Sequence, residues 1–243
     1  MLWADRLPRL GGIVLLLLSI AIIVSVVASM GISENDPFMR SEIKGYLQDI
    51  AGHNTEAICG LIASILADSV LGILAAVTLF TLFRDRAPAL ATAALVLIVA
   101  AAAAFMVADG LTAAVINVAN DFSEGGPEGV AAGSPQILEV GRAMAIAQGD
   151  AEQIGWTALS AGFLLFGAII AWAPAGAVNP PRWLGIVSVI AGVAGFLTWI
   201  MVAGDAAFVF FIIGGLAQLV VLIGLGIWLL MRGEAQTSPA RAA

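Results

Sequence analysis

Residues 88–107 read PALATAALVLIVAAAAAFMV and contain no charged side chain. A helix of about 20 apolar residues is long enough to cross the hydrocarbon core of a bilayer, which is roughly 30 Å thick. Similar stretches recur along the chain, and none alternates apolar and polar residues as barrel strands do, so we expect helices. The sequence therefore predicts an all-α fold, a polytopic membrane helical bundle. Its six transmembrane helices are predicted at about 10–30, 55–83, 88–118, 154–173, 183–203 and 206–231.

The composition of the whole chain also indicates a membrane protein. Of its 243 residues, 61 % are hydrophobic and 11 % are charged, and the mean hydropathy is +1.03. Soluble proteins are about 45–50 % apolar, with about a quarter of their residues charged. A soluble domain with the present composition could not cover its core with polar surface. We expect a single membrane domain over residues 1–243, with a disordered cytoplasmic tail at 232–243.

Rare residue types exclude several classes of function. The chain has one cysteine, Cys59, and one histidine, His53, which excludes disulfides within the chain, CxxC redox pairs and multi-histidine metal or haem sites. The net charge of −7 and the lack of a basic cluster argue against nucleic-acid binding, and no P-loop pattern occurs. We expect no catalytic residues, no metal and no cofactor, and this interpretation leans away from an enzyme.

The distribution of basic residues predicts the orientation in the membrane. With the N-terminus inside, the cytoplasmic segments would hold seven of the ten basic residues, and the long external loops would hold most of the acids. The positive-inside rule then places both termini in the cytoplasm, and the expected location is the bacterial plasma (inner) membrane. The seven basic residues are Arg6, Arg9, Arg84, Arg86, Arg182, Arg232 and Arg241.

Each of the two long external loops contains an amphipathic segment. Asp36 and Pro37 are typical of a helix start, and the helix predicted after them reaches about Ile50. Its apolar residues share one face, which suits a helix on the outer membrane surface or one that covers the bundle. Ser134 and Pro135 start a second segment that continues to about Gln148. The alternative is that both are ordinary connectors. The residues expected on the apolar face of the first helix are Phe38, Ile43, Tyr46, Leu47 and Ile50.

Ionisable residues at membrane depth are the natural candidates for a functional site, because burying them in lipid is costly. Two acids are predicted there, Asp68 in the second helix and Asp109 in the third. At 1.5 Å per residue they lie roughly 20 Å and roughly 12–14 Å from the external ends of their helices. We therefore expect them to approach one external cavity without being level with each other. Gln218 is expected near the depth of Asp68, and Asn117 adds a polar group close by.

Two interpretations of Asp68 stay open. In the first, Asp68 binds a proton or a cation in a polar cavity open to the outside. In the second, it is protonated, or hydrogen-bonded to a Ser or Gln residue of another helix, and only stabilises the bundle. No Lys or Arg is predicted at membrane depth, so no salt bridge within the chain would neutralise Asp68.

Three stretches together resemble a known family. They are RLGGIVLLLL at 9–18, ADSVLGILAAVTLFTLFRDRAP at 67–88 and NPPRWLGIVSVIAGVAGF at 179–196. They are similar to an uncharacterised family of six-helix bacterial membrane proteins, which is catalogued as a domain of unknown function and is common in actinobacteria. The resemblance covers about residues 9–231. It implies a topology, and it implies no reaction, ligand or catalytic residue.

Three functions follow from these observations as hypotheses. The leading one is a lipid- or small-molecule-binding membrane protein, or an accessory subunit with a protein partner in a membrane complex. The alternative is a proton- or cation-linked transporter or channel that uses Asp68 and Asp109. An intramembrane enzyme with Asp68 as general acid–base is the third, and it lacks a second catalytic group. Membrane lipids are the expected surroundings in every case.

Overall fold

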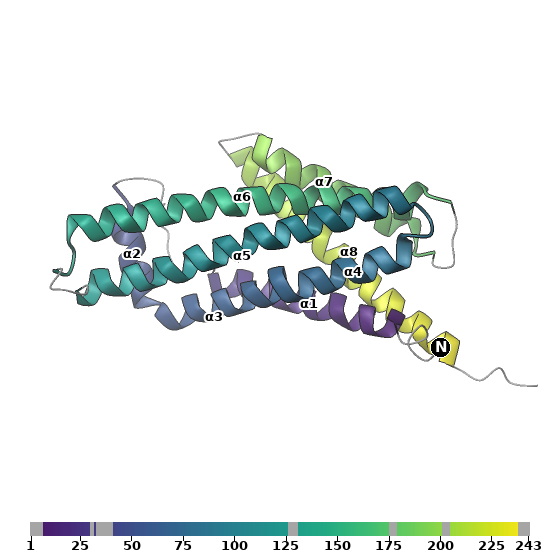
Figure 1. The fold of residues 1–243 in the computed structure, drawn as a ribbon, viewed down its shortest axis with the longest axis horizontal. Helices are drawn as coiled ribbons and strands as arrows, with labels where there is room; N and C mark the ends of the chain where they lie inside the picture. Colours follow the sequence, from purple (N-terminus) through teal and green to yellow (C-terminus); the bar gives the residue numbers. More distant parts are fainter. Residues whose placement is uncertain are drawn as a thin grey trace, which may run out of the picture. The chain divides into compact units, whose positions relative to one another are not determined.

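The computed structural model describes residues 7–29, 32, 41–125, 131–174, 179–200 and 205–237. Within these residues every regular element is helical and no strand occurs (Figure 1), which confirms the predicted all-α class. The elements are α1 (Leu7–Ser29), α2 (Ile43–Gly52), α3 (Asn54–Ser64), the π-helix η1 (Ile65–Leu71), α4 (Gly72–Phe83), α5 (Pro88–Glu124), α6 (Pro135–Trp172), α7 (Arg182–Ile200) and α8 (Asp205–Thr237).

Five stretches of the described chain are long and apolar enough to cross a membrane. They are Pro8–Ala28, Asn54–Phe83, Pro88–Glu124, Pro135–Trp172 and Val209–Arg232. The apolar stretch in α7, Arg182–Thr198, is shorter. The protein is thus a multi-pass helical membrane protein whose apolar helices contact lipid. A sixth span and the orientation of the chain stay predictions.

Several helix boundaries differ from those predicted. The second external segment and the fourth predicted span form one continuous helix, the 38-residue α6, and α5 extends to Glu124 instead of about 118. The last helix reaches Thr237, because residues after Met231 such as Glu234, Ala235 and Gln236 are good helix formers. The first external helix is described only from Ile43, and the part predicted before residue 41 lies outside the described residues.

The chain forms two compact units. The first unit comprises Met1–Ile20, Val70–Ala102 and Gly155–Ala243. The second unit comprises Ala21–Ser69 and Ala103–Ile154. Both units are made of helices only within the described residues, and each is described below by itself.

Close helix crossings hold the first unit together. A Cβ atom placed on Gly185 of α7 would lie 2.6 Å from the backbone nitrogen of Ala171 in α6. A Cβ on Gly167 of α6 would lie 2.7 Å from the backbone oxygen of Gly185. The same relation joins α1 and α8, because a Cβ on Gly12 would lie 2.8 Å from the backbone oxygen of Gly226. Glycine at these positions lets the helix backbones touch, which is how helices in lipid gain packing energy.

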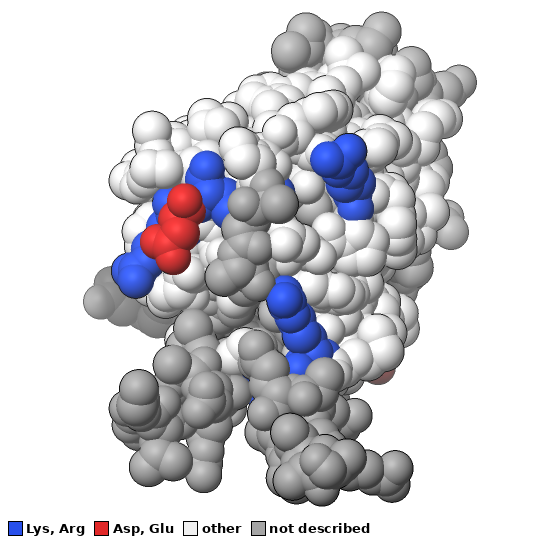
Figure 2. All heavy atoms as spheres, turned by 90° about the vertical axis from the view of Figure 1, so that its right-hand side faces the viewer, with Lys and Arg blue, Asp and Glu red and all other residues white. Residues whose placement is uncertain are grey.

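Arginines gather at one end of the first unit. Among the charged side chains on the face that carries the α4–α5 turn, residues 84–87, most are basic (Figure 2). Arg86 donates from Nε to the Pro174 oxygen at 2.9 Å and from Nη2 to the Ala173 oxygen at 2.8 Å, so it caps the C-terminal end of α6. Burial, and then the neighbouring charge of Arg182, lower the pKa of Arg86. This cap ties the α4–α5 turn to the end of α6.

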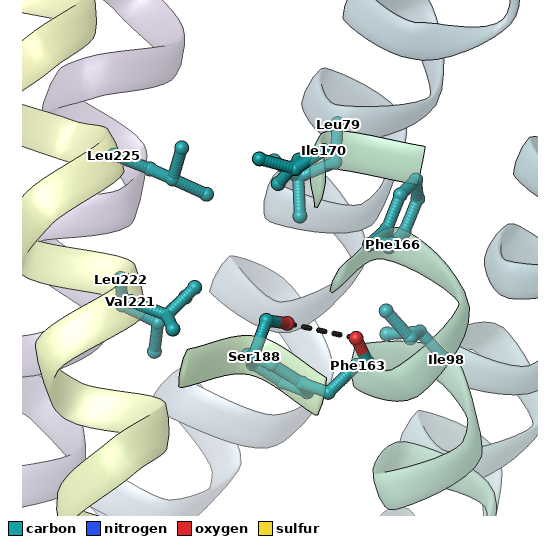
Figure 3. Close-up of a pocket in the computed structure, with 9 residues that line it drawn as sticks. All are labelled: Leu79, Ile98, Phe163, Phe166, Ile170, Ser188, Val221, Leu222 and Leu225. Atoms are coloured by element: carbon teal, nitrogen blue, oxygen red, sulfur yellow. Dashed lines mark hydrogen bonds between the residues drawn. The ribbon is translucent and has the colours of Figure 1, made fainter. Parts of the chain in front are cut away.

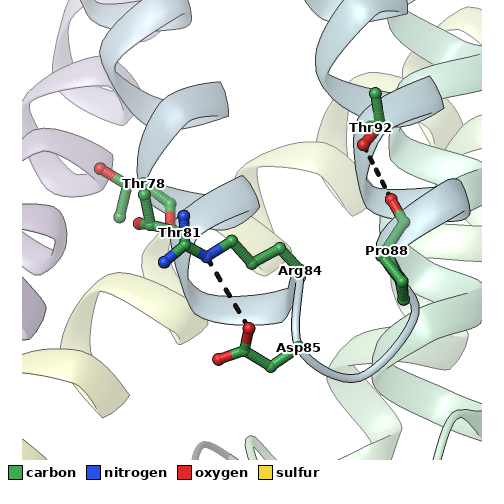
Figure 4. Close-up of polar contacts among 6 residues, drawn as sticks. All are labelled: Thr78, Thr81, Arg84, Asp85, Pro88 and Thr92. Carbon is green, nitrogen blue, oxygen red and sulfur yellow. Dashed lines mark hydrogen bonds and ion pairs between the residues drawn. The ribbon is translucent and has the colours of Figure 1, made fainter.

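Polar side chains in the same region are satisfied locally. Thr92 donates to the Pro88 oxygen at 2.8 Å in the first turn of α5 (Figure 4), and Thr81 donates to the Thr78 oxygen at 2.8 Å. In lipid such bonds to the preceding helical turn keep a hydroxyl paired. Arg84 and Asp85 form an exposed ion pair of 3.8 Å, which contributes little to stability.

Helix α2 packs on α5 in the second unit (Figure 1). Its residues Ile43, Leu47 and Ile50 are buried, as the predicted apolar face requires, and Tyr46 packs against them. Their partners on α5 are buried as well. The predicted amphipathic helix therefore covers other helices of its unit with its apolar face. The α5 partners are Val115, Ile116, Ala119 and Phe122.

Candidate functional site

An apolar cavity in the first unit is too small to be a ligand site. Its volume is about 10 Å³, roughly the space that one water molecule needs. It is lined by Leu79, Ile98, Phe163, Phe166, Ile170, Ser188, Val221, Leu222 and Leu225 (Figure 3). The one polar side chain in this lining, Ser188, donates to the Phe163 oxygen at 2.7 Å. We interpret the cavity as a packing defect between helices.

The second unit brings two of the predicted acids together. The Ser64 hydroxyl lies 3.0 Å from Asp68 Oδ2 and 2.8 Å from Asp109 Oδ1. Ser64 and Asp68 are four residues apart on one helical face, and Asp109 reaches the same hydroxyl from α5. Ser64 lies one helical turn from Asp68, so these contacts leave the expected difference in depth between the two aspartates as a prediction. We call Asp68, Ser64 and Asp109 the bridged carboxyl pair.

The backbone around Asp68 is unusual. Asp68 is the central residue of η1, the only π-helical segment among the described residues. A π-helical turn holds one more residue than an α-helical turn. Such turns are rare, and they occur frequently at functional sites. The neighbouring Ser69 is 7 % exposed, and its hydroxyl has no partner among the described residues. The helix thus departs from regular geometry at the acid that the sequence singled out.

The hydrogen count at Ser64 restricts the protonation of the pair. A serine hydroxyl has one hydrogen to donate and can accept two. With both aspartates ionised, the two contacts would have to share one hydrogen in a three-centre bond, which is weaker than two full hydrogen bonds. Each contact is a full hydrogen bond only if one carboxyl group carries a proton and donates it to the Ser64 oxygen. The geometry therefore fits a pair that holds at least one proton.

Asp109 has the smaller exposed fraction of the two aspartates. It is 8 % exposed, and its Oδ2 atom is buried without a hydrogen-bond partner among the described residues. No described Lys or Arg forms an ion pair with Asp68 or Asp109. An ionised carboxylate in such surroundings is costly, whereas a protonated one is tolerated. The burial of Asp109 thus supports the same conclusion as the hydrogen count.

A third acid, Glu152 of α6, lies in the same unit and was not among the predicted site residues. Gln148 donates from Nε2 to Glu152 Oε1 at 3.0 Å. Glu152 is close enough for its charge to repel the charges of Asp68 and Asp109. Burial, and then the charge of Glu152, raise the pKa of Tyr46 on α2 to about 12, so this tyrosine stays neutral near neutral pH. Sequence analysis assigned Glu152 to an external loop. The four-residue spacing from Gln148, typical of one helical face, is the signal that could have found it.

The other two predicted site residues are Asn117 and Gln218. Asn117 is on α5, eight residues beyond Asp109, and is exposed. Gln218 is on α8 in the first unit and is 6 % exposed. Their assignment to the site stays a prediction.

The acids in the described part of the chain do not make a metal centre. No group of three or more His, Cys, Asp or Glu side chains there is arranged to hold a metal ion. The bridged carboxyl pair places two carboxyl groups around one hydroxyl, whereas Ca²⁺ and Mg²⁺ take six or more oxygen ligands. The arrangement suits a proton better than a divalent metal.

The bridging hydroxyl gives a testable prediction. Replacing Ser64 by alanine removes the one described hydrogen-bond partner of Asp109, and we expect a loss of about 1–3 kcal/mol of stability, because the buried carboxyl then has none. Ser64→Thr keeps the hydroxyl and serves as the control. The measurement is thermal unfolding of the purified protein in detergent, followed by circular dichroism. Equal midpoints for Ser64→Ala and Ser64→Thr would show that the bridge does not stabilise the fold.

Comparison with known proteins identifies the family. The family described as a domain of unknown function, DUF4386, matches residues 10–233, and the chain belongs to it. The resemblance found in the sequence is thereby confirmed. No curated protein and no solved structure is significantly similar to the chain. The family supplies no assigned ligand or reaction, so a function has to be argued from the residues of the second unit.

Proposed function

We propose that this member of a family of unknown function moves protons across the membrane, alone or together with a solute. The bridged carboxyl pair would hold the proton in transit. The observation that carries the proposal is the single Ser64 hydroxyl between Asp68 Oδ2 and Asp109 Oδ1. Intramembrane acids of this kind are typical of proton pathways in pumps and transporters.

The chemistry of the pair supports reversible proton binding. With one proton the two carboxyl groups share a single negative charge, and with two protons they are neutral. Groups this close titrate as one unit, so gaining or losing a proton changes the charge of the whole pair by one. The neutral form of the pair is tolerated in the low-dielectric interior of the membrane. The charged form can bind a proton again. Such a pair can load and unload without a metal or a cofactor.

The proposal is tested by proton flux. The purified protein is placed in liposomes that contain a pH-sensitive dye, and a potassium gradient with valinomycin sets an inward driving force for protons. We expect the lumen to acidify faster than in liposomes without protein. A rate equal to that of protein-free liposomes would contradict the proposal.

A second candidate function is a lipid- or small-molecule-binding protein, or an accessory subunit of a membrane complex. It is favoured by the start of α8, where consecutive apolar side chains on different sides of the helix are exposed and available to lipid or to a partner subunit. A lipid or subunit that copurifies in fixed proportion would support this candidate over proton movement. The exposed side chains are Val209, Phe211, Ile212 and Ile213.

The proposed location is the plasma (inner) membrane of a bacterium. The support for it is the arginine-rich end of the first unit, which suits the cytoplasmic side. The same proposal includes six membrane spans in one membrane domain. It also includes a cytoplasmic location for both termini.

A further inference from the structure

The end of α6 and the start of α7 lie side by side in the first unit. A Cβ atom on Gly185 of α7 would lie 2.6 Å from the Ala171 nitrogen of α6, and a Cβ on Gly192 would lie 2.9 Å from the Leu164 nitrogen. Seven residues forward along α7 thus match seven residues back along α6, so the two helices are antiparallel. Arg182 begins α7 three residues before Gly185, which is about one helical turn. It therefore lies beside the last residues of α6.

Arg86 of the α4–α5 turn is fixed at the same place. Its Nη2 donates to the Ala173 oxygen at 2.8 Å, and its Nε donates to the Pro174 oxygen at 2.9 Å. These two residues directly follow the end of α6 at Trp172, so the Arg86 guanidinium is at the level of Arg182. After burial, the charge of Arg182 is the cause that lowers the pKa of Arg86, as expected of two neighbouring cations. An anion at this level would relieve the repulsion between them.

Negative charge is scarce in the first unit. Asp85 is the one acid of this unit whose side chain the structure describes, and it pairs with Arg84 at 3.8 Å (Figure 4). Five arginines of the unit have described side chains, so positive charge exceeds negative charge among these residues. Arg182 is exposed. An anion from outside the chain would balance this charge. The five arginines are Arg9, Arg84, Arg86, Arg182 and Arg232.

Two tryptophans flank the arginines and indicate the level of the membrane surface. Trp172 ends α6 and is 67 % exposed, and Trp183 follows Arg182 and is 52 % exposed. Tryptophan is enriched at the level of the lipid headgroups, because its ring is amphipathic. Exposed tryptophans beside arginines are thus expected where the apolar helix surface meets the phosphate groups. A ligand that matches this surface combines a phosphate group with an apolar part.

We propose that Arg86 and Arg182 bind the phosphate group of an anionic phospholipid where α6 ends and α7 begins. Arg182 contacts the phosphate oxygens, because a guanidinium group matches them with two parallel hydrogen bonds. Arg86 adds a second, fixed charge, and the start of α7 adds the positive end of the helix dipole. Basic pockets between membrane helices bind anionic headgroups through such groups.

The tryptophans favour a lipid over a free anion as the occupant. The exposed rings of Trp172 and Trp183 contact the glycerol and the upper acyl chains of the lipid. Inorganic phosphate has no apolar part for these rings to contact. The proposal is independent of the proposed movement of protons, because every residue in it belongs to the first unit and the bridged carboxyl pair belongs to the second.

The test compares two lipids on the purified full chain. Native mass spectrometry of the protein released from detergent micelles measures the binding of phosphatidylglycerol, which is anionic, and of phosphatidylcholine, which has no net charge. We expect the wild-type chain to bind phosphatidylglycerol more tightly. Arg182→Gln should weaken this binding about fivefold, the effect typical of one cationic side chain near an anionic membrane surface. Its binding of phosphatidylcholine should not change.

A control variant and a second measurement make the result specific. Lys44→Gln removes an exposed basic residue of α2 in the second unit, and we expect it to bind phosphatidylglycerol as the wild-type chain does. The second measurement does not need Arg182→Gln to fold. Phosphatidylglycerol brominated on its acyl chains should quench the tryptophan fluorescence of the wild-type chain more than brominated phosphatidylcholine, and Trp183→Phe should reduce the difference.

Three outcomes would overturn the inference. The first is equal binding of the two lipids, or equal quenching by them, in the wild-type chain. The second is an equal loss of binding in Arg182→Gln and Lys44→Gln, because the attraction would then come from overall charge. The third is binding of inorganic phosphate as tight as that of phosphatidylglycerol, which would show a site for a free anion. None of these outcomes changes the expected proton flux through the bridged carboxyl pair.

Discussion

Asp109→Asn is expected to abolish the proton flux of the protein in liposomes, reducing it by at least about a hundredfold. Asparagine has the shape of aspartate, and its amide can donate a hydrogen bond to Ser64 while Ser64 donates to Asp68. The hydrogen bonds around Ser64 are then complete without an acidic proton. The variant should therefore fold, while its pair no longer binds and releases a proton at this position.

A second aspartate of the same helix provides the control for this prediction. Asp121 lies twelve residues beyond Asp109 on α5 and belongs to the same unit, so Asp121→Asn makes the same substitution outside the carboxyl pair. We expect Asp121→Asn to conduct protons at the wild-type rate. A wild-type flux in Asp109→Asn, or an equal loss in both variants, would show that the bridged pair is not the proton site.

The fold class and the two acids of the pair were predictable from the distribution of charged residues along the sequence. Long apolar stretches identify membrane helices, and an aspartate inside one of them stands out. The apolar face of α2 was predictable for a similar reason, since Ile43, Leu47 and Ile50 recur at helical spacing. These features depend on local sequence alone.

The parts of the site that were missed depend on geometry that local sequence does not encode. The predicted second segment ended at about Gln148 and the fourth span began at about 154, which left a loop between them. Residues 136–173 contain no proline, and α6 passes through them without a break. The π-helical turn around Asp68 was not predicted from the sequence. The contact of Ser64 with Asp109 joins two helices, and hydropathy alone does not show which side chains of two helices meet.

Gly185→Ala is expected to destabilise the first unit by roughly 3 kcal/mol or more, which is at the upper end of the cost of overpacking a helix interface. The added Cβ would lie 2.6 Å from the Ala171 nitrogen and 2.8 Å from the Gly167 oxygen. Both are backbone atoms of α6, so no side chain can turn away to make room. Helices α6 and α7 would have to separate, and the packing along their whole crossing would weaken.

Gly215→Ala is the matched control, because a Cβ on Gly215 of α8 meets no atom within 4 Å. Alanine also favours the helix over glycine, so this variant is expected to be at least as stable as the wild-type protein. Thermal unfolding in detergent, followed by circular dichroism, gives both midpoints. Since membrane helices gain little from hydrophobic burial, the loss of close packing at Gly185 should show as a clearly lower midpoint. Equal midpoints for the two variants would mean that the contact of α6 with α7 at Gly185 is not what holds these helices together.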